Sequence, residues 1–229
     1  FRIARPSGPP FYGKDINIYK EKPVTDSIFQ VYKEQFSYDR KDLKPGVDWR
    51  QESSDWIQER ITFDATYGSE RVIAYLFLPK KTPPPYQTVI YFPGSASEYQ
   101  RSSQDLETYY EFPMFLSFIV KSGRAVLYPV YKGTFERGND ALAALIDGDQ
   151  NNHQYAELFI QQVKDFKRCV DYLETRQDID SKKLAYYGMS WGGPLGSIIP
   201  AVEDRLKVSV LIAGGFQGLA RPEVNQINY

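Results

Sequence analysis

The residues Gly188-Met189-Ser190-Trp191-Gly192-Gly193 decide the fold of this 229-residue chain. The segment before them predicts a strand and the segment after them predicts a helix, so this Gly-x-Ser-x-Gly motif lies in a sharp strand-to-helix turn. Such a turn lifts Ser190 above the edge of a sheet in a strained backbone conformation. Gly188 and Gly192 are needed because these two positions crowd each other and the neighbouring strand. The motif therefore predicts that Ser190 is a nucleophile.

Around this motif, apolar strands alternate with helices from residue 87 onward. Strands are expected over 88–92, 125–130, 184–187 and 208–213, and helices over 113–123, 155–173 and 192–201, with a long loop over 131–153. Short strands that are apolar on both faces, joined by helices, are typical of a parallel sheet that is covered on both sides. The sequence therefore predicts an α/β fold.

The residues before this alternation predict antiparallel strands. The segments 61–66 and 72–78 flank a turn at Tyr67-Gly68-Ser69-Glu70, which is the pattern of a hairpin. Trp49 and Trp56 extend this hairpin upstream into a meander. We therefore expect a mostly parallel sheet that carries an antiparallel meander at its N-terminal edge.

The N-terminal residues predict an extension ahead of this domain. Residues 1 to about 22 lack a clear hydrophobic period, and 25–36 predicts a short amphipathic helix with Asp26 or Ser27 near its cap. We assign residues 1–46 to an N-terminal extension and 47–229 to the α/β domain.

Composition excludes several classes of function. Lys and Arg total 28 against 29 Asp and Glu, so the chain lacks the basic excess of a nucleic-acid-binding protein. No apolar run approaches the roughly 18 residues of a membrane span. His153 and Cys169 are the only residues of their kinds, so a zinc site with several histidines and an intrachain disulfide are both impossible. We expect no metal or other cofactor, and the sparse cysteine favours the cytoplasm.

A nucleophilic serine that attacks a carbonyl requires two backbone N–H groups to stabilise the oxyanion. The first is expected from Trp191, the residue after the nucleophile. The second is expected from the loop Pro93-Gly94-Ser95-Ala96-Ser97, which directly follows the strand over 88–92. Proline has no N–H, and the favoured donor is the N–H of Ser95, with Ala96 as the alternative. A nucleophilic serine hydroxyl together with two such N–H donors indicates an acyl-transfer reaction.

The motif residues and three other segments resemble the α/β-hydrolase superfamily, in the branch of dienelactone hydrolases, prolyl-oligopeptidase-like enzymes and acetylxylan esterases. The residues that carry the resemblance are Thr88-Val-Ile-Tyr-Phe-Pro-Gly94, Ala125-Val-Leu-Tyr-Pro-Val-Tyr-Lys-Gly133, Asp178-Ile-Asp180 and Gly188–Gly193. The chain also looks like the hydrolase module at the C-terminal end of some bacterial kinase-linked multidomain proteins. The resemblance covers about residues 60–229. It implies a serine esterase that acts on small carboxylic esters through an acyl-enzyme on Ser190.

In that superfamily the acid and then the histidine follow the serine along the chain. No histidine follows Ser190 here, so the sequence predicts a domain that stops before its last strands. The general-base histidine is then expected from outside residues 1–229, in a C-terminal continuation or a second polypeptide. Within the chain, Glu223 is a candidate acid and His153 a candidate base, and a surface position is the competing interpretation of each.

Two other functions compete with the esterase. A hydrolase fold without a base serves as a scaffold or interaction module, and a peptidase of the prolyl-oligopeptidase type shares the same serine motif. The absence of propeller-like repeats upstream argues against the peptidase. Arg168 and Asp171, three residues apart on the helix over 155–173, are expected to form an exposed ion pair.

Overall fold

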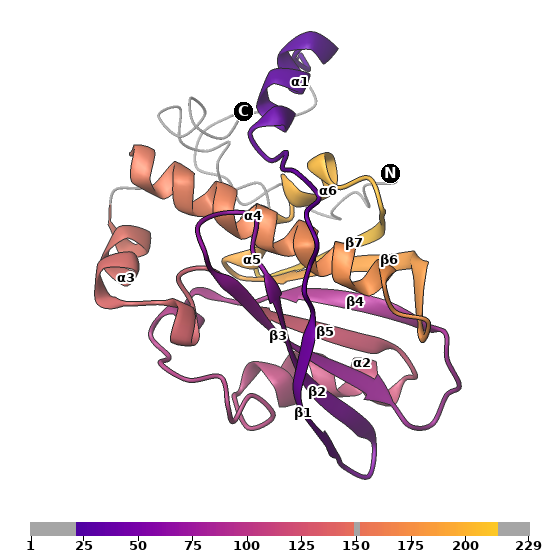
Figure 1. Cartoon of the computed structure of the whole chain (residues 1–229). Coiled ribbons are helices and arrows are strands. Elements are labelled where there is room, and N and C mark those ends of the chain that lie inside the picture. The colour runs from indigo at the N-terminus through magenta and orange to yellow at the C-terminus, as the bar shows by residue number, and fades with distance from the viewer. Residues whose placement is uncertain (1–21, 149–151, 215–229) are drawn as a thin grey trace, which may run out of the picture.

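The computed structural model describes residues 22–148 and 152–214, in which seven strands form one sheet (Figure 1). The strand order is β1-β2-β3-β5-β4-β6-β7. The strands are β1 (Gly46–Glu52), β2 (Trp56–Asp64), β3 (Arg71–Pro79), β4 (Tyr86–Phe92), β5 (Ala125–Val130), β6 (Ile179–Met189) and β7 (Leu206–Ile212). β1, β2 and β3 pair antiparallel, β3 is antiparallel to β5, and β5, β4, β6 and β7 are mutually parallel. The mostly parallel sheet with an antiparallel meander at its edge confirms the expected fold class.

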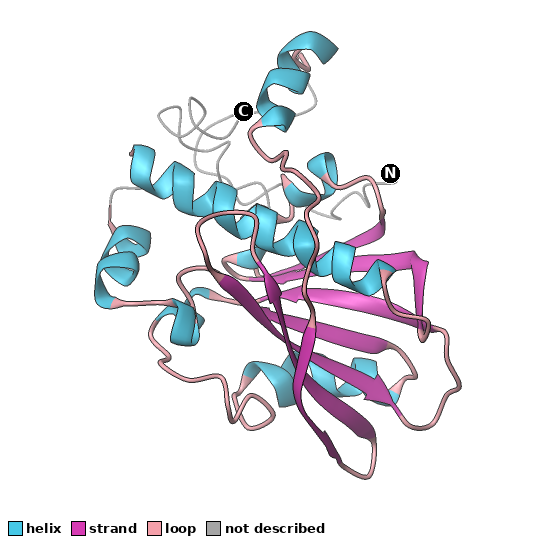
Figure 2. Cartoon of the chain, in the orientation of Figure 1, coloured by secondary structure: helices cyan, strands magenta, loops and turns pink. Residues whose placement is uncertain are grey.

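Helices cover both faces of this sheet, with α4 on one face and α2 on the other (Figure 2). The α-helices are α1 (Asp26–Glu34), α2 (Ser117–Lys121), α3 (Asp140–Asp147), α4 (His153–Glu174), α5 (Gly192–Leu195) and α6 (Ile199–Val202). A π-helical turn, η2 (Phe112–Leu116), precedes α2, and the 3₁₀ turns are η1 (Ser95–Glu98) and η3 (Phe135–Arg137). In the described part of the chain, no helix has the length and apolarity that crossing a membrane requires.

Each face of the sheet has its own apolar core, because successive side chains of a strand point to opposite faces. On β3, Leu76 belongs to the core beneath α4, whereas Tyr75 and Phe77 belong to the core on the side of α2. The helix α4 contributes Val163, Phe166, Cys169, Val170 and Leu173 to the first core, and the segment 112–120 contributes Phe112, Leu116 and Val120 to the second. The two cores fix β4 and β6, the strands that lead to the serine motif.

Several helices differ from the sequence prediction. The segment 131–153 is not only a loop, since α3 forms within it, capped by the Asn139 side chain that accepts the Leu142 N–H at 2.9 Å. The single helix expected over 192–201 is two short helices, because Pro200 has no N–H to donate to the preceding turn. The N-cap of α1 is Thr25, whose hydroxyl accepts the Ile28 N–H, and Asp26 and Ser27, expected near the cap, are the first two residues of the helix.

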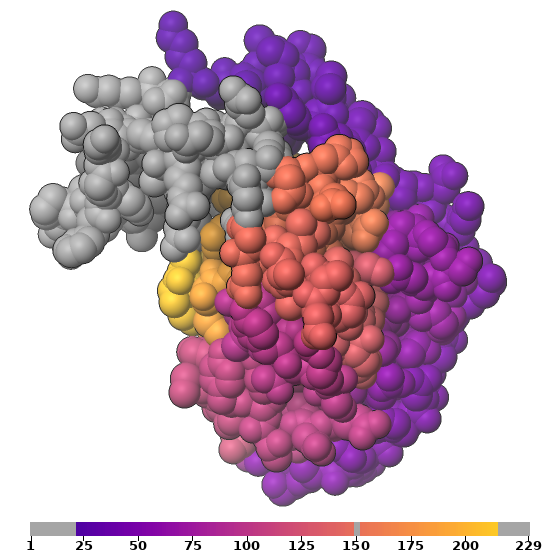
Figure 3. All heavy atoms as spheres, turned by 90° about the vertical axis from the view of Figure 1, so that its left-hand side faces the viewer, coloured from indigo at the N-terminus to yellow at the C-terminus, as the bar shows by residue number. Residues whose placement is uncertain are grey.

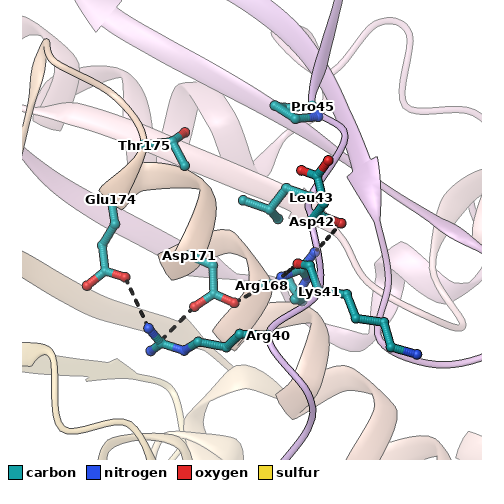
Figure 4. A pocket seen from close by; sticks show the side chains of 9 residues that line it. All are labelled: Arg40, Lys41, Asp42, Leu43, Pro45, Arg168, Asp171, Glu174 and Thr175. Atoms are coloured by element: carbon teal, nitrogen blue, oxygen red, sulfur yellow. Dashed lines mark hydrogen bonds and ion pairs between the residues drawn. The ribbon is translucent and has the colours of Figure 1, made fainter.

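The expectation that Arg168 and Asp171 form an exposed pair is wrong. Their side chains are only 3% and 8% exposed, and they form a 3.2 Å ion pair beneath the segment that leads into β1. Asp171 also accepts a hydrogen bond from Tyr38 at 2.9 Å and pairs with Arg205 at 2.7 Å. A pocket of about 480 Å³ opens between this segment and α4, and Arg40 is among the residues that line it (Figure 4). Tertiary packing of residues far apart in the sequence has turned a surface pair into a buried polar network.

Candidate active site

Ser190 occupies a sharp turn between β6 and α5. Its φ of +48° lies in the left-handed region, which a residue with a side chain adopts only under strain. The Ser190 N–H donates to the Ile212 carbonyl at 2.8 Å, and its carbonyl accepts the Gly193 N–H at 2.8 Å. These bonds tie the turn to β7 on one side and to α5 on the other. The strained conformation therefore persists because both neighbours hold it.

The two glycines of the motif stand where no side chain fits. A Cβ atom on Gly188 would lie 2.1 Å from the carbonyl oxygen of Gly192, and one on Gly192 would lie 2.5 Å from the carbonyl oxygen of Phe92. Both contacts are with backbone atoms, which cannot turn away as a flexible side chain can. The crowding that the sequence predicts at this turn is present, and it involves β4 as the neighbouring strand.

The loop after β4 meets this turn directly. The Pro93 carbonyl accepts the Gly192 N–H at 3.2 Å, so the loop and the start of α5 are joined by a backbone hydrogen bond. Among the described residues, no acceptor is found for the backbone N–H groups of Trp191, Ser95 and Ala96. The structure thus joins the start of the loop that contains both candidate donors to the turn that contains Ser190 and Trp191. Two free N–H groups from different segments beside one serine are what an oxyanion hole needs.

The buried Glu111 was not identified from the sequence. Its Oε1 accepts the Gly94 N–H at 3.0 Å, and its Oε2 accepts the Tyr128 hydroxyl at 3.0 Å. Burial raises the pKa of this carboxyl, whereas its hydrogen-bond donors act in the opposite direction. The one signal in the sequence is an acidic residue just before an apolar helix that begins with Phe112-Pro113. Nothing in that signal links Glu111 to a loop 17 residues away.

Glu98, also missed from the sequence, is a second buried carboxyl close to this loop. It lies at the end of η1, is 1% exposed, and neither of its carboxylate oxygens has a hydrogen-bond partner in the described residues. The adjacent Tyr99 hydroxyl donates to Asp147 of α3, and Figure 3 shows α3 at the surface above this segment. Burial, and then the charge of Asp147, raise the pKa of Glu98 to about 7. Perturbed carboxyls of this kind concentrate at functional sites.

We expect Glu98→Gln to change the pH dependence of stability. The folded-state pKa of about 7 exceeds the usual carboxyl value of 4.5, so folding binds a proton between these values. Wild type therefore loses stability as the pH rises from about 4.5 to about 7, and Glu98→Gln removes this loss. Thermal melts at pH 5 and pH 8 should show the variant gaining a few degrees over wild type only at pH 8, since ~1 kcal/mol corresponds to about 2–4 °C.

The exposed Glu157 on α4 provides the matched control for this experiment. Glu157→Gln removes the same charge from the surface and should follow the wild-type pH dependence. A difference between Glu98→Gln and wild type that is the same at both pH values would contradict the assigned pKa.

Of the two candidate residues for the base and the acid, His153 lies within the described residues and Glu223 does not. His153 is exposed at the first residue of α4, and no hydrogen bond joins it to Ser190 in the part of the chain that is described. The first turn of α4 is capped by the side chain of Asn152, which accepts the Tyr155 N–H at 2.7 Å. Glu223 lies outside the described residues. Over residues 22–148 and 152–214, no group of three or more His, Cys, Asp or Glu side chains is placed to hold a metal ion.

The chain resembles one known protein in sequence and several solved structures in fold. No model of a known protein family matches the chain. It is 25% identical over 170 residues to the protein named "Putative hydrolase YtaP" from Bacillus subtilis (strain 168), a match that covers 70% of this chain and 54% of that protein. The chain thus spans about half the length of the curated relative that it matches.

The solved structures that it resembles include two acetyl xylan esterases. The enzyme from Paenibacillus sp. R4 has a TM-score of 0.57 at 20% identity, over 84% of this chain and 61% of that one. Acetyl xylan esterase 1 from Thermoanaerobacterium sp. JW/SL YS485 has a TM-score of 0.59 at 18% identity, over 86% of this chain and 62% of that one. At these identities the likeness establishes the fold. Sheet order, strand-to-helix serine turn and structural neighbours agree that the chain has the α/β-hydrolase fold.

Proposed function

We propose that this chain forms the part of a serine esterase that supplies the nucleophile and the oxyanion hole. The observation that carries the proposal is the strained Ser190, at φ +48°, in a turn joined to the loop after β4; among the described residues, the N–H groups of Trp191 and of Ser95 and Ala96 in that loop have no acceptor. Strain of this kind persists only where the surrounding structure holds it in place, and here it places a half-buried serine directly after the end of β6. The names of the structural neighbours support an ester of a small acyl group, such as acetate, as the substrate.

In the proposed reaction, Ser190 Oγ forms a bond to the carbonyl carbon of the ester while a general base removes the hydroxyl proton. The carbonyl oxygen becomes an oxyanion that accepts hydrogen bonds from the N–H of Trp191 and the N–H of Ser95, with Ala96 as the alternative. Collapse of this intermediate breaks the bond to the alcohol oxygen, which leaves with the proton. Water then hydrolyses the acyl-enzyme by the same route.

The general base in this proposal is a histidine from outside residues 1–229, in a continuation of the chain or in a second polypeptide. The one histidine of the sequence, His153, is exposed at the start of α4. The chain that follows β7 starts beside the nucleophile, since a Cβ on Gly214 would lie 2.5 Å from the Ser190 carbonyl oxygen. Glu223, nine residues after Gly214 in the sequence and outside the described residues, is our candidate for the acid.

A fluorophosphonate probe applied to the full-length protein tests the proposal, because it reacts only with an activated serine. We expect labelling at Ser190, identified by peptide mass spectrometry, and loss of labelling in Ser190→Ala. Ser197→Ala is the matched control, since the Ser197 hydroxyl in the same segment donates to the Pro194 carbonyl at 2.6 Å and should not react. Absence of labelling in wild type would favour the scaffold function. A labelled protein that cleaves a prolyl anilide but not p-nitrophenyl acetate would favour the peptidase.

A further inference from the structure

Glu111 is a fully buried carboxyl that the proposed reaction does not use. It is 0% exposed, and no Lys, Arg or His side chain pairs with it among the described residues. Moving a carboxylate out of water is costly unless strong donors replace the water. The donors here are the Gly94 N–H at 3.0 Å, the Tyr128 hydroxyl at 3.0 Å and the Tyr110 hydroxyl at 3.1 Å. Such a costly arrangement calls for an explanation beyond packing.

The bond to Gly94 connects Glu111 to the loop that carries the second oxyanion donor. A Cβ on Gly94 would lie 3.1 Å from Glu111 Oε1 and 2.7 Å from Met189 Cε, so the Gly94 backbone is held between these two side chains. Met189 is the residue before the nucleophile. Glu111 therefore fixes the loop at the point where it meets the serine turn.

The same bond also sets the direction of the next peptide group. The Gly94 N–H is committed to Glu111, so it cannot turn toward a substrate. With Gly94 held at φ −75° and ψ 166°, the peptide group between Gly94 and Ser95 has a defined orientation, and it carries the N–H of Ser95. Oxyanion donors act through their fixed direction, because a donor that must reorient during the reaction stabilises the transition state less.

We propose that Glu111 is a positioning residue for the oxyanion hole, which acts through the Gly94 N–H to aim the Ser95 N–H at the oxyanion formed on Ser190. This inference rests on the proposed esterase function. It assigns to Glu111 no contact with the substrate and no proton transfer. We therefore expect Glu111 to stabilise the transition state, and so to affect kcat, without changing how tightly the ester binds.

Glu111→Gln in the full-length protein tests this role. An amide oxygen still accepts the Gly94 N–H, but it is a weaker acceptor than a carboxylate, and the amide NH₂ must replace the other acceptor oxygen. We expect kcat for an acetyl ester to fall by about 10-fold or more, with KM within about 2-fold of wild type; removing an oxyanion donor outright costs about 10²–10³-fold. A boronic acid that forms a tetrahedral adduct with Ser190 should lose affinity by a similar factor. All rates are normalised to the number of serines that the fluorophosphonate titrates.

Tyr128→Phe provides a milder second variant, since it removes one donor to Glu111 and leaves the loop itself unchanged. We expect a smaller fall in kcat with the same constant KM. Tyr75→Phe is its matched control, because the Tyr75 hydroxyl is equally buried in the same apolar core and bonds to Ser103 at 2.9 Å. That variant should keep the wild-type kcat.

The outcomes separate this inference from the proposed function. If wild type is labelled and active but Glu111→Gln and Tyr128→Phe keep the wild-type kcat per titrated serine, the positioning role is overturned and the esterase stands. The role is also overturned if the variants have fewer serines that the fluorophosphonate labels, or a lower melting temperature, but an unchanged kcat per labelled serine. That pattern would show that Glu111 acts only on folding. If wild type is not labelled at Ser190, the esterase proposal fails, and the role of Glu111 fails with it.

Discussion

Replacing Ser190 with alanine is expected to lower ester hydrolysis by the full-length protein by at least about 10⁴-fold. The nucleophile acts as a unit with its base and oxyanion hole, so its removal leaves only the modest catalysis that binding and the oxyanion donors provide. The variant should fold normally, because alanine occupies the same backbone conformation and the Ser190 N–H still reaches the Ile212 carbonyl. Initial rates with p-nitrophenyl acetate, set against the melting temperature, measure both effects.

Ser190→Gly provides the comparison that isolates backbone strain at the same site. Glycine has no Cβ and adopts the φ of +48° without strain, whereas the Cβ of serine or alanine makes this conformation strained. We expect the glycine variant to be inactive but more stable than the alanine variant by about 1 kcal/mol in urea unfolding. Equal stability of the two variants would show that the turn stores no strain, and retention of activity in either would rule out Ser190 as the nucleophile.

Gly188→Ala is expected to have the largest effect on stability. Its Cβ would lie 2.1 Å from the Gly192 carbonyl oxygen and 2.7 Å from Tyr186 Cε1, which is far inside van der Waals contact. The end of β6 or the start of α5 must move to relieve this clash, and both are packed against β4 and β7. We expect a loss of about 3 kcal/mol or more, at the upper end of what overpacking costs, together with loss of ester hydrolysis. Urea unfolding followed by circular dichroism measures the first.

Gly46→Ala is the matched control for this substitution. Gly46 is also a strand residue, but its Cβ would meet only Thr62 Oγ1, at an ordinary distance of 3.7 Å. That variant should remain within about 0.5 kcal/mol of wild type. If the two substitutions cost the same, the crowding at Gly188 is not what makes glycine necessary there.

The serine turn could be predicted from sequence because its requirements are local. Gly188 and Gly192 lie two residues on either side of Ser190, so their mutual crowding follows from the geometry of one short turn. The strands could be predicted for a similar reason. A short run that is apolar at every position, such as that of β5, is typical of a strand with both faces buried inside a covered sheet.

The two carboxyls near the loop could not be predicted, because their properties come from distant segments. Glu111 gains its role from Gly94 and Tyr128, each 17 residues away. Glu98 gains its raised pKa from burial and from Asp147 of α3, a helix within the segment that the sequence predicts to be a loop. The burial of Arg168 could not be predicted for the same reason, because a segment more than 120 residues upstream covers this side chain.

The pairing of β4 with β6 has a consequence for how this protein can change over evolutionary time. Phe92 lies opposite Gly188, so the loop with the oxyanion donors and the turn with the nucleophile leave the sheet from adjacent, aligned strand ends. A slip of one residue between these strands would displace one loop against the other by about 3.3 Å, whereas a working site tolerates only about 0.5 Å. Insertions and deletions inside β4 or β6 should therefore be purged from its lineage, as should those between Phe92 and Glu111, because they would break the bond from the Gly94 N–H to Glu111.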